Sequence, residues 1–75
     1  MSGIENYENL ANAIVLQAVR DYRTALKLLK MNPSNKSAKI EKENIERFFW
    51  SDWYKVLTSV DGESLIRVLR KEVDA

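Results

Sequence analysis

Apolar residues recur at steps of three and four through residues 6–31, a stretch that contains neither glycine nor proline. The main stripe consists of Tyr7, Leu10, Ala11, Ile14, Ala18, Tyr22, Ala25 and Leu29. This spacing predicts a long amphipathic helix. A second set, formed by Val15, Val19 and Leu26, widens the apolar face. Such a broad face suits a helix that is contacted on two sides, by its own domain and by a partner.

The ends of this helix are marked by local signals. Ser2 or Asn6 could cap its start, because a side-chain oxygen at that position accepts a hydrogen bond from a free backbone N–H. Near the other end Asn32 precedes Pro33, and a residue before proline is steered out of the helical conformation. The helix is therefore predicted to end near Met31.

A second helix is predicted over residues 35–50, with Ser34 or Asn35 as its cap. Its first half is mostly polar, and Ile45 and Phe48 belong to one narrow apolar edge. The connection to the first helix is short, so the two helices are expected to form an antiparallel hairpin.

Ser51 and Asp52 favour the start of a new helix directly after the second one. Serine is a good N-cap residue, and aspartate suits the positive end of a helix dipole. We therefore predict a break near Trp50 and a short helix over residues 52–58. The alternative is a second helix that continues straight through Ser51, which is permitted but less favoured.

The last predicted helix covers residues 62–73 and follows Asp61 or Ser59 as its cap. Its inward side would carry Leu65, Ile66, Leu69 and Val73. The predicted fold is thus all-α, with residues 1–75 forming a single helical domain. An antiparallel helical hairpin, a short helix and a C-terminal helix would pack as a small bundle.

The composition excludes several kinds of chemistry. The chain of 75 residues is long enough for one domain only, and it contains no cysteine and no histidine. Thiolate nucleophiles, thiolate metal sites and the usual general base are therefore missing. Catalysis by carboxylates, with Tyr7 or Tyr22, has no positive support. We predict a protein that is not an enzyme and needs no cofactor or metal.

Cellular location is addressed by two weaker signals. The longest apolar run, residues 13–16, is far too short to cross a bilayer. A chain without cysteine fits the reducing cytoplasm. We therefore expect a cytoplasmic protein without a membrane-spanning segment.

Five of the seven aromatic residues lie between Phe48 and Tyr54. We expect Phe48 and Trp53 to complete the core, because so small a domain needs large side chains to pack. The five rings point around most of a helix and cannot all face one core. Trp50, Tyr54 and Phe49 are therefore predicted to bind another protein or to mediate self-association into a homodimer or larger assembly, since exposed Trp and Tyr are enriched at binding hot spots.

Basic residues offer an alternative function, the binding of DNA or RNA through phosphate contacts. The candidates are Arg20, Arg23, Lys27 and Lys30 on the first helix and Arg67, Arg70 and Lys71 on the last. A solvated helix face is the simpler interpretation, because acidic residues are interspersed and the formal net charge is only +1. Nucleic-acid binding therefore ranks second.

Three segments resemble a group of small uncharacterised proteins from prophages and mobile elements of Gram-positive bacteria. They are YENLANAIVLQAVRDY at residues 7–22, ERFFWSDWYKVLT at residues 46–58 and DGE at residues 61–63. This resemblance brings no established activity and no functional residue. It implies a context in which small proteins often act by binding, as inhibitors of host or defence proteins or as adaptors. The expected function is thus non-enzymatic protein binding.

Overall fold

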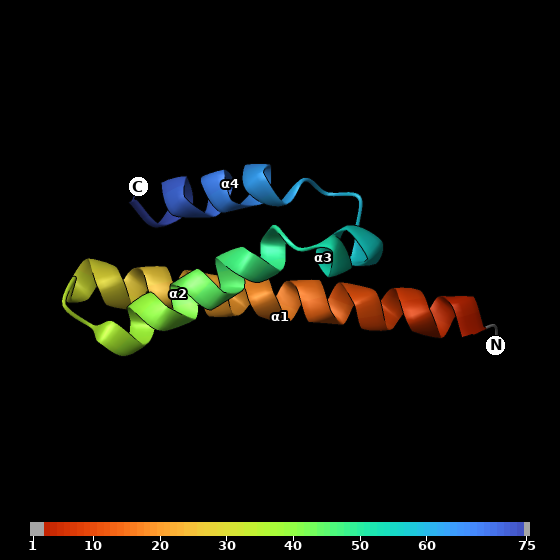
Figure 1. The fold of residues 1–75 in the computed structure, drawn as a ribbon, viewed down its shortest axis with the longest axis horizontal. Coiled ribbons are helices and arrows are strands. Elements are labelled where there is room, and N and C mark those ends of the chain that lie inside the picture. The colour runs from red at the N-terminus through yellow and green to blue at the C-terminus, as the bar shows by residue number, and fades with distance from the viewer. Residues whose placement is uncertain (1–2, 75) are drawn as a thin grey trace.

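A computed structural model describes residues 3–74, with side chains from Tyr7 onward, and shows an all-α fold, as predicted. Four helices follow one another along these residues (Figure 1): α1 Gly3–Met31, α2 Lys36–Phe49, α3 Asp52–Leu57 and α4 Gly62–Asp74. No strand occurs between residues 3 and 74. Each helix begins and ends within one turn of the position expected from the sequence.

The helices form an elongated bundle of 47 × 21 × 20 Å around α1. Helices α1 and α2 run antiparallel, and α4 lies along this pair and returns toward the C-terminal end of α1 (Figure 1). The short α3 packs against the N-terminal half of α1, while α1 contacts all three other helices. The first turns of α1 extend beyond α3, and no other helix lies beside them in Figure 1.

Two caps define the boundaries of α2 and α3. The Asn35 side chain accepts a hydrogen bond from the Ala38 backbone N–H at 3.0 Å. The Ser51 hydroxyl accepts one from the Tyr54 N–H at 3.1 Å and donates one to the Phe48 carbonyl at 2.6 Å. Ser51 therefore ends one helix and starts the next. The predicted break is confirmed, and a helix running straight through Ser51 is wrong.

For the last helix the structure identifies the cap residue, and for the first helix it rules out one of the two candidates. The Asp61 carboxylate accepts hydrogen bonds from the Ser64 N–H at 3.0 Å and from the Ser64 hydroxyl at 2.8 Å, so Asp61 is the cap of α4. At the other end of the chain α1 already includes Asn6, which is therefore not its cap. Ser2, the other candidate, lies outside the described residues.

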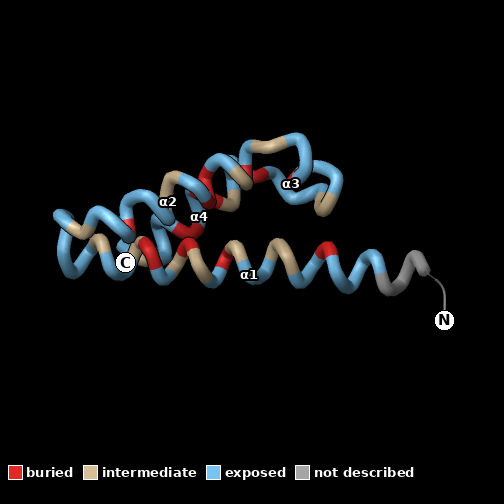
Figure 2. The backbone as a smooth tube through the Cα atoms, turned by 60° about the horizontal axis from the view of Figure 1, so that its bottom comes forward, coloured by how far each residue is buried: buried red, intermediate tan, exposed pale blue. Residues whose placement is uncertain are grey.

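The core lies where α1, α2 and α4 meet, with Tyr54 contributed by α3. Its largest buried side chains are Tyr22, Tyr54, Phe49, Ile66 and Leu69. The Phe49 ring stands edge-on to both Tyr22 and Tyr54, with ring centres 5.7 and 5.6 Å apart. Figure 2 shows buried positions of α1 turned toward the helices packed on it, while the outer side of α1 is exposed. The core thus uses one side of α1 and leaves another side free.

Candidate protein-binding surface

The structure corrects the predicted roles of the aromatic rings. Phe49 and Tyr54, expected at the surface, are each only 1% exposed, whereas Trp53, expected in the core, is 56% exposed. The cause is the turn at Ser51, which restarts the helix so that Tyr54 faces inward. Trp53, one residue earlier, lies about 100° around the helix and faces solvent. Of the three predicted binding residues, only Trp50 remains exposed.

Phe48 connects the core with the surface. The sequence predicted Phe48 in the core, but the side chain is only half-buried. Its ring packs against Trp53 with centres 5.4 Å apart and against Tyr54 with centres 5.6 Å apart, both edge-on. Phe48 therefore holds the exposed Trp53 ring against the bundle rather than leaving it free in solvent.

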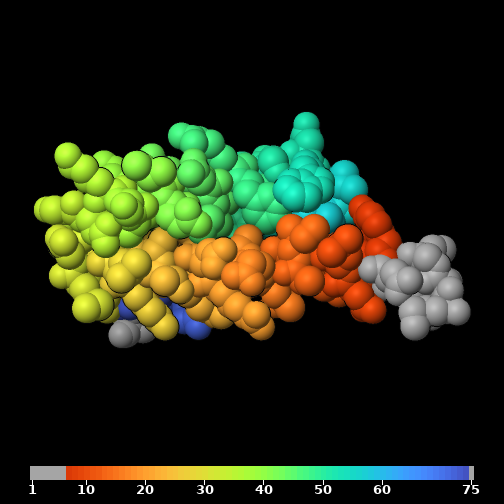
Figure 3. Space-filling model, turned by 90° about the horizontal axis from the view of Figure 1, so that it is seen from below, coloured from red at the N-terminus to blue at the C-terminus, as the bar shows by residue number. Residues whose placement is uncertain are grey.

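Beside Trp53 lies a groove of about 370 Å³, here named the Trp53 groove. It is lined by Ile14, Gln17, Ala18 and Asp21 of α1, Asn44, Ile45 and Phe48 of α2, and Trp53 of α3. Figure 3 shows the face of the molecule on which α1 lies beside α2 and α3, with α4 mostly hidden behind. The groove combines apolar walls with a few polar groups, the usual make-up of a site that takes an apolar side chain of a partner.

Trp50 occupies a different position, on the side of α4. Its indole N–H donates a hydrogen bond to the Glu63 carboxylate at 2.6 Å. It borders a second pocket of about 420 Å³, which is formed largely by the connection between α3 and α4. This pocket is lined by charged and hydroxyl-bearing residues, among them Lys55, Thr58 and Asp61. Because Trp50 is hydrogen-bonded within the chain and has polar neighbours, it suits an apolar interface less well than Trp53.

An ionic network around the buried Glu46 joins the three long helices and was not foreseen from the sequence. Glu46 is 5% exposed, and its carboxylate accepts hydrogen bonds from the Tyr22 hydroxyl at 2.5 Å and from the Arg70 guanidinium at 2.6 Å. Lys42 adds an ion pair at 3.3 Å, and Arg70 also donates to the Tyr22 oxygen at 3.2 Å. The network fixes how α1, α2 and α4 pack, because each helix contributes a polar group that must be satisfied.

The network changes the acidity of its members. Burial alone would raise the pKa of Glu46, but the hydrogen bonds from Tyr22, Arg70 and Lys42 outweigh burial and lower this pKa below its ordinary value of 4.5. Burial and the hydrogen bond to Glu46 raise the pKa of Tyr22 to about 12. Folding therefore favours an ionised Glu46 and a neutral Tyr22.

This shift of Glu46 predicts a pH dependence. A carboxyl group whose pKa is lowered by folding contributes stability above its unfolded pKa and loses it as the pH falls through the folded pKa. We expect Glu46→Gln to be less stable than the wild type at neutral pH, and this gap to close as the pH falls below about 4.5. Urea unfolding of both proteins across this range measures the gap. A gap that stays constant would contradict the ionised network.

Three of the seven predicted phosphate-binding residues have partners elsewhere in the chain. Arg23 pairs with Glu72 at 3.2 Å, Lys30 donates to the Val73 carbonyl at 2.9 Å, and Arg70 pairs with the buried Glu46 at 2.6 Å. The packing of α1 on α4 thus brings the two basic groups together but gives these three members partners within the chain. Arg20, Lys27, Arg67 and Lys71 are exposed.

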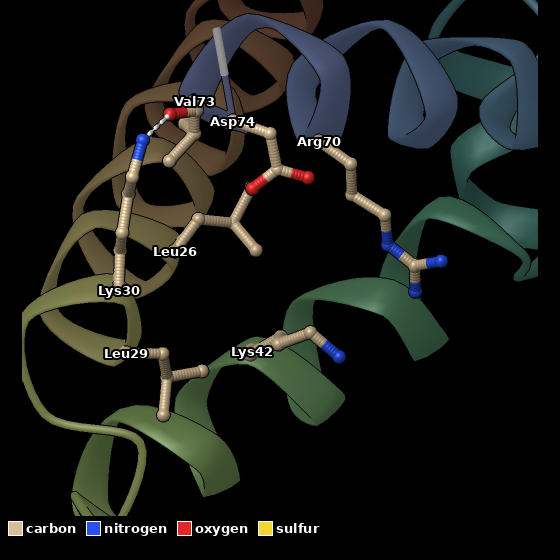
Figure 4. A pocket seen from close by; sticks show the side chains of 7 residues that line it. All are labelled: Leu26, Leu29, Lys30, Lys42, Arg70, Val73 and Asp74. Atoms are coloured by element: carbon tan, nitrogen blue, oxygen red, sulfur yellow. Dashed lines mark hydrogen bonds between the residues drawn. The ribbon is translucent and has the colours of Figure 1, made fainter.

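Figure 4 shows the pocket of about 400 Å³ around which Lys30, Lys42 and Arg70 gather. The carboxylate of Asp74 also lies among them, and Leu26, Leu29 and Val73 complete the lining. Because each cation already has an acceptor and a carboxylate shares the space, this arrangement gives nucleic-acid binding less support than the sequence did.

Two further observations concern the described residues as a whole. Between residues 3 and 74, no helix is long and apolar enough to cross a membrane. In the same part of the chain, no three carboxylates gather as ligands for a metal ion.

No protein-family model, no curated protein and no solved structure matches this chain.

Proposed function

We propose that this protein acts by binding another protein through the Trp53 groove. The binding would be non-enzymatic, and the resemblance to small prophage and mobile-element proteins supports a role as inhibitor or adaptor of a host or defence protein in the bacterial cytoplasm. The observation that carries the proposal is the exposed Trp53 ring, held by Phe48 at the edge of an apolar groove.

The surface around the groove supports this proposal. Tyr7, Leu10 and Ile14 follow one another at steps of three and four on α1, so they lie on one side of that helix. Tyr7 and Leu10 are exposed, and Ile14 lines the groove. The apolar surface therefore continues from the groove along α1, and a contiguous exposed apolar surface is typical of a protein interaction site.

The position of Trp53 also suits an energetic hot spot. Tryptophan provides a large contact area, and residues of this type dominate binding energy when a partner excludes water from them. Truncation at such a position costs about 2 kcal/mol or more, which is roughly a thirtyfold loss of affinity.

Affinity capture with a matched pair of variants tests the proposal. Tagged wild type, Trp53→Ala and Val68→Ala are incubated with lysate of a Gram-positive host, and captured proteins are quantified by mass spectrometry. Val68 serves as the control because it is similarly exposed but lies on α4, away from the groove. Circular dichroism checks that all three proteins are folded.

We expect one or a few host proteins to be captured by the wild type and by Val68→Ala but not by Trp53→Ala. Titration of the purified partner should then show an affinity loss of at least about thirtyfold for Trp53→Ala. Equal capture by all three proteins would contradict a role of the groove, and capture of nothing specific by the wild type would contradict the proposed function.

A further inference from the structure

We propose that the part of the partner that enters the Trp53 groove is an amphipathic helix, with a lysine or arginine two turns away from its apolar anchor residue. This inference rests on the proposed function and deepens it, because it states the chemistry of the occupant of the same groove. Two observations carry it: a second hollow that continues the groove between α1 and α2, and two carboxylates in that hollow whose charge is not paired.

The Trp53 groove continues into a second hollow of about 390 Å³ between α1 and α2, here named the acidic hollow. Asp21 lines both spaces, so they are continuous. Along α1 their combined lining runs from Ile14 to Leu28, which is about 21 Å on a helix. A partner helix of about four turns has the same length.

A helix suits this site because two antiparallel helices form its walls. No residue of α4 lines either space. Figure 3 shows α1 and α2 side by side, with α4 mostly hidden behind them. A partner helix laid along this face would rest between α1 and α2 in the helix-in-groove mode of recognition, in which contact residues recur at steps of three, four and seven.

The acidic hollow carries negative charge and is lined by no basic residue. Its charged lining residues are Asp21 of α1 and Glu41 of α2. Asp21 accepts a hydrogen bond from Gln17 at 2.9 Å, but this neutral amide leaves the charge uncompensated. Neither carboxylate forms an ion pair with any side chain described from Tyr7 onward. The charge of both carboxylates is therefore available to a partner.

The sequence around Asp21 and Glu41 explains why they stay unpaired. Ion pairs within a helix form at steps of three or four residues. At these steps both acids have only uncharged neighbours, namely Gln17, Ala18, Thr24, Ala25, Ser37, Ala38, Asn44 and Ile45. The closest cations in sequence are one or two residues away, and therefore lie about 100° or 200° around the helix. They are Arg20, Arg23, Lys39 and Lys42.

The distance between the two spaces sets the spacing expected in the partner. Gln17 lines the Trp53 groove and Thr24 lines the acidic hollow, so the two lie seven residues apart on α1, about 10 Å. Residues seven positions apart lie on the same face of a helix. A partner helix with its apolar anchor in the groove would thus present the residue seven positions away to Asp21 and Glu41. Charge complementarity at this second position would provide specificity.

Selection from a displayed library of 16-residue helical peptides tests the inference without knowledge of the natural partner. The folded full-length chain is the bait, as wild type, as Trp53→Ala and as a double variant that combines Asp21→Asn with Glu41→Gln. Glu43→Gln is the matched control, because Glu43 lies on α2 two residues after Glu41 and lines neither space. Circular dichroism checks that every bait is folded.

We expect the wild type and Glu43→Gln to enrich peptides with a large apolar residue and a lysine or arginine seven positions from it. These peptides should fail to bind Trp53→Ala. They should bind the double variant at least about tenfold more weakly, with a smaller dependence on salt. Enrichment without a basic residue at that spacing, or equal binding by the double variant, would overturn the inference.

These results are separable from those for the proposed function. If peptides bind through Trp53 regardless of Asp21 and Glu41, the groove remains a protein-binding site and the basic residue of the partner is refuted. Failure to enrich any peptide would refute a helical occupant, while capture of a host protein from lysate would still support the proposed function. If basic peptides bind as described but lysate yields no specific protein, the chemistry of the groove stands and the role as inhibitor or adaptor fails.

Discussion

Phe49→Ala is expected to lower the free energy of unfolding by about 3–5 kcal/mol, whereas Trp53→Ala should lower it by less than about 1 kcal/mol. Phe49 is 1% exposed and packs edge-on against Tyr22 and Tyr54, so truncation leaves a cavity at the centre of the bundle. Trp53 is mostly exposed and loses contact chiefly with Phe48.

The size of the domain makes this difference easy to observe. A chain of 75 residues is expected to have a total stability of roughly 4–11 kcal/mol. The loss at Phe49 thus removes a large part of the total, and the variant is expected to be partly unfolded at 25 °C. Chemical denaturation followed by circular dichroism measures both variants. A larger loss for Trp53→Ala than for Phe49→Ala would contradict the ring positions described here.

Gly62→Ala is expected to destabilise the protein by about 2–3 kcal/mol, opposite in sign to the usual effect of this change in a helix. Gly62 is the first residue of α4 and lies against the last residue of α2. A Cβ atom at this position would stand 2.1 Å from the Phe49 carbonyl oxygen and 2.9 Å from its carbonyl carbon. Backbone atoms cannot rotate away, so α4 would have to move from α2.

Thermal and urea unfolding of Gly62→Ala and Val68→Ala checks this prediction. Val68 is exposed in the middle of α4, so alanine at that position should change the stability by no more than about 0.5 kcal/mol. A Gly62→Ala protein as stable as the wild type would show that α4 does not approach α2 closely. Such a result would also contradict the helix packing that positions Arg70 beside Glu46.

The turn at Ser51 links the core to the proposed binding surface. By ending α2 and restarting the helix, it turns Tyr54 inward and Trp53 outward, and Phe48 connects the two. The aromatic segment therefore supplies both the centre of the bundle and the edge of the Trp53 groove. This arrangement explains how five neighbouring rings are used in a domain too small to bury all of them.

Local signals determined the helices of this protein. The spacing of apolar residues, the Asn32-Pro33 pair and the caps at Asn35, Ser51 and Asp61 depend on interactions between residues a few positions apart, so the sequence predicts them directly. The all-α fold and the break before α3 follow from these signals, since each helix end needs its own hydrogen-bond partners.

Only the tertiary structure decided which rings are buried and which charges are paired. A small change in helix phase at Ser51 exchanges the environments of Trp53 and Tyr54, and periodicity does not determine that phase across a break. The network of Tyr22, Glu46 and Arg70 joins residues 24 and 48 positions apart, without a local pattern to reveal it. Burial and ion pairing depend on how distant helices pack, and that packing also leaves the Trp53 groove open on one side of α1.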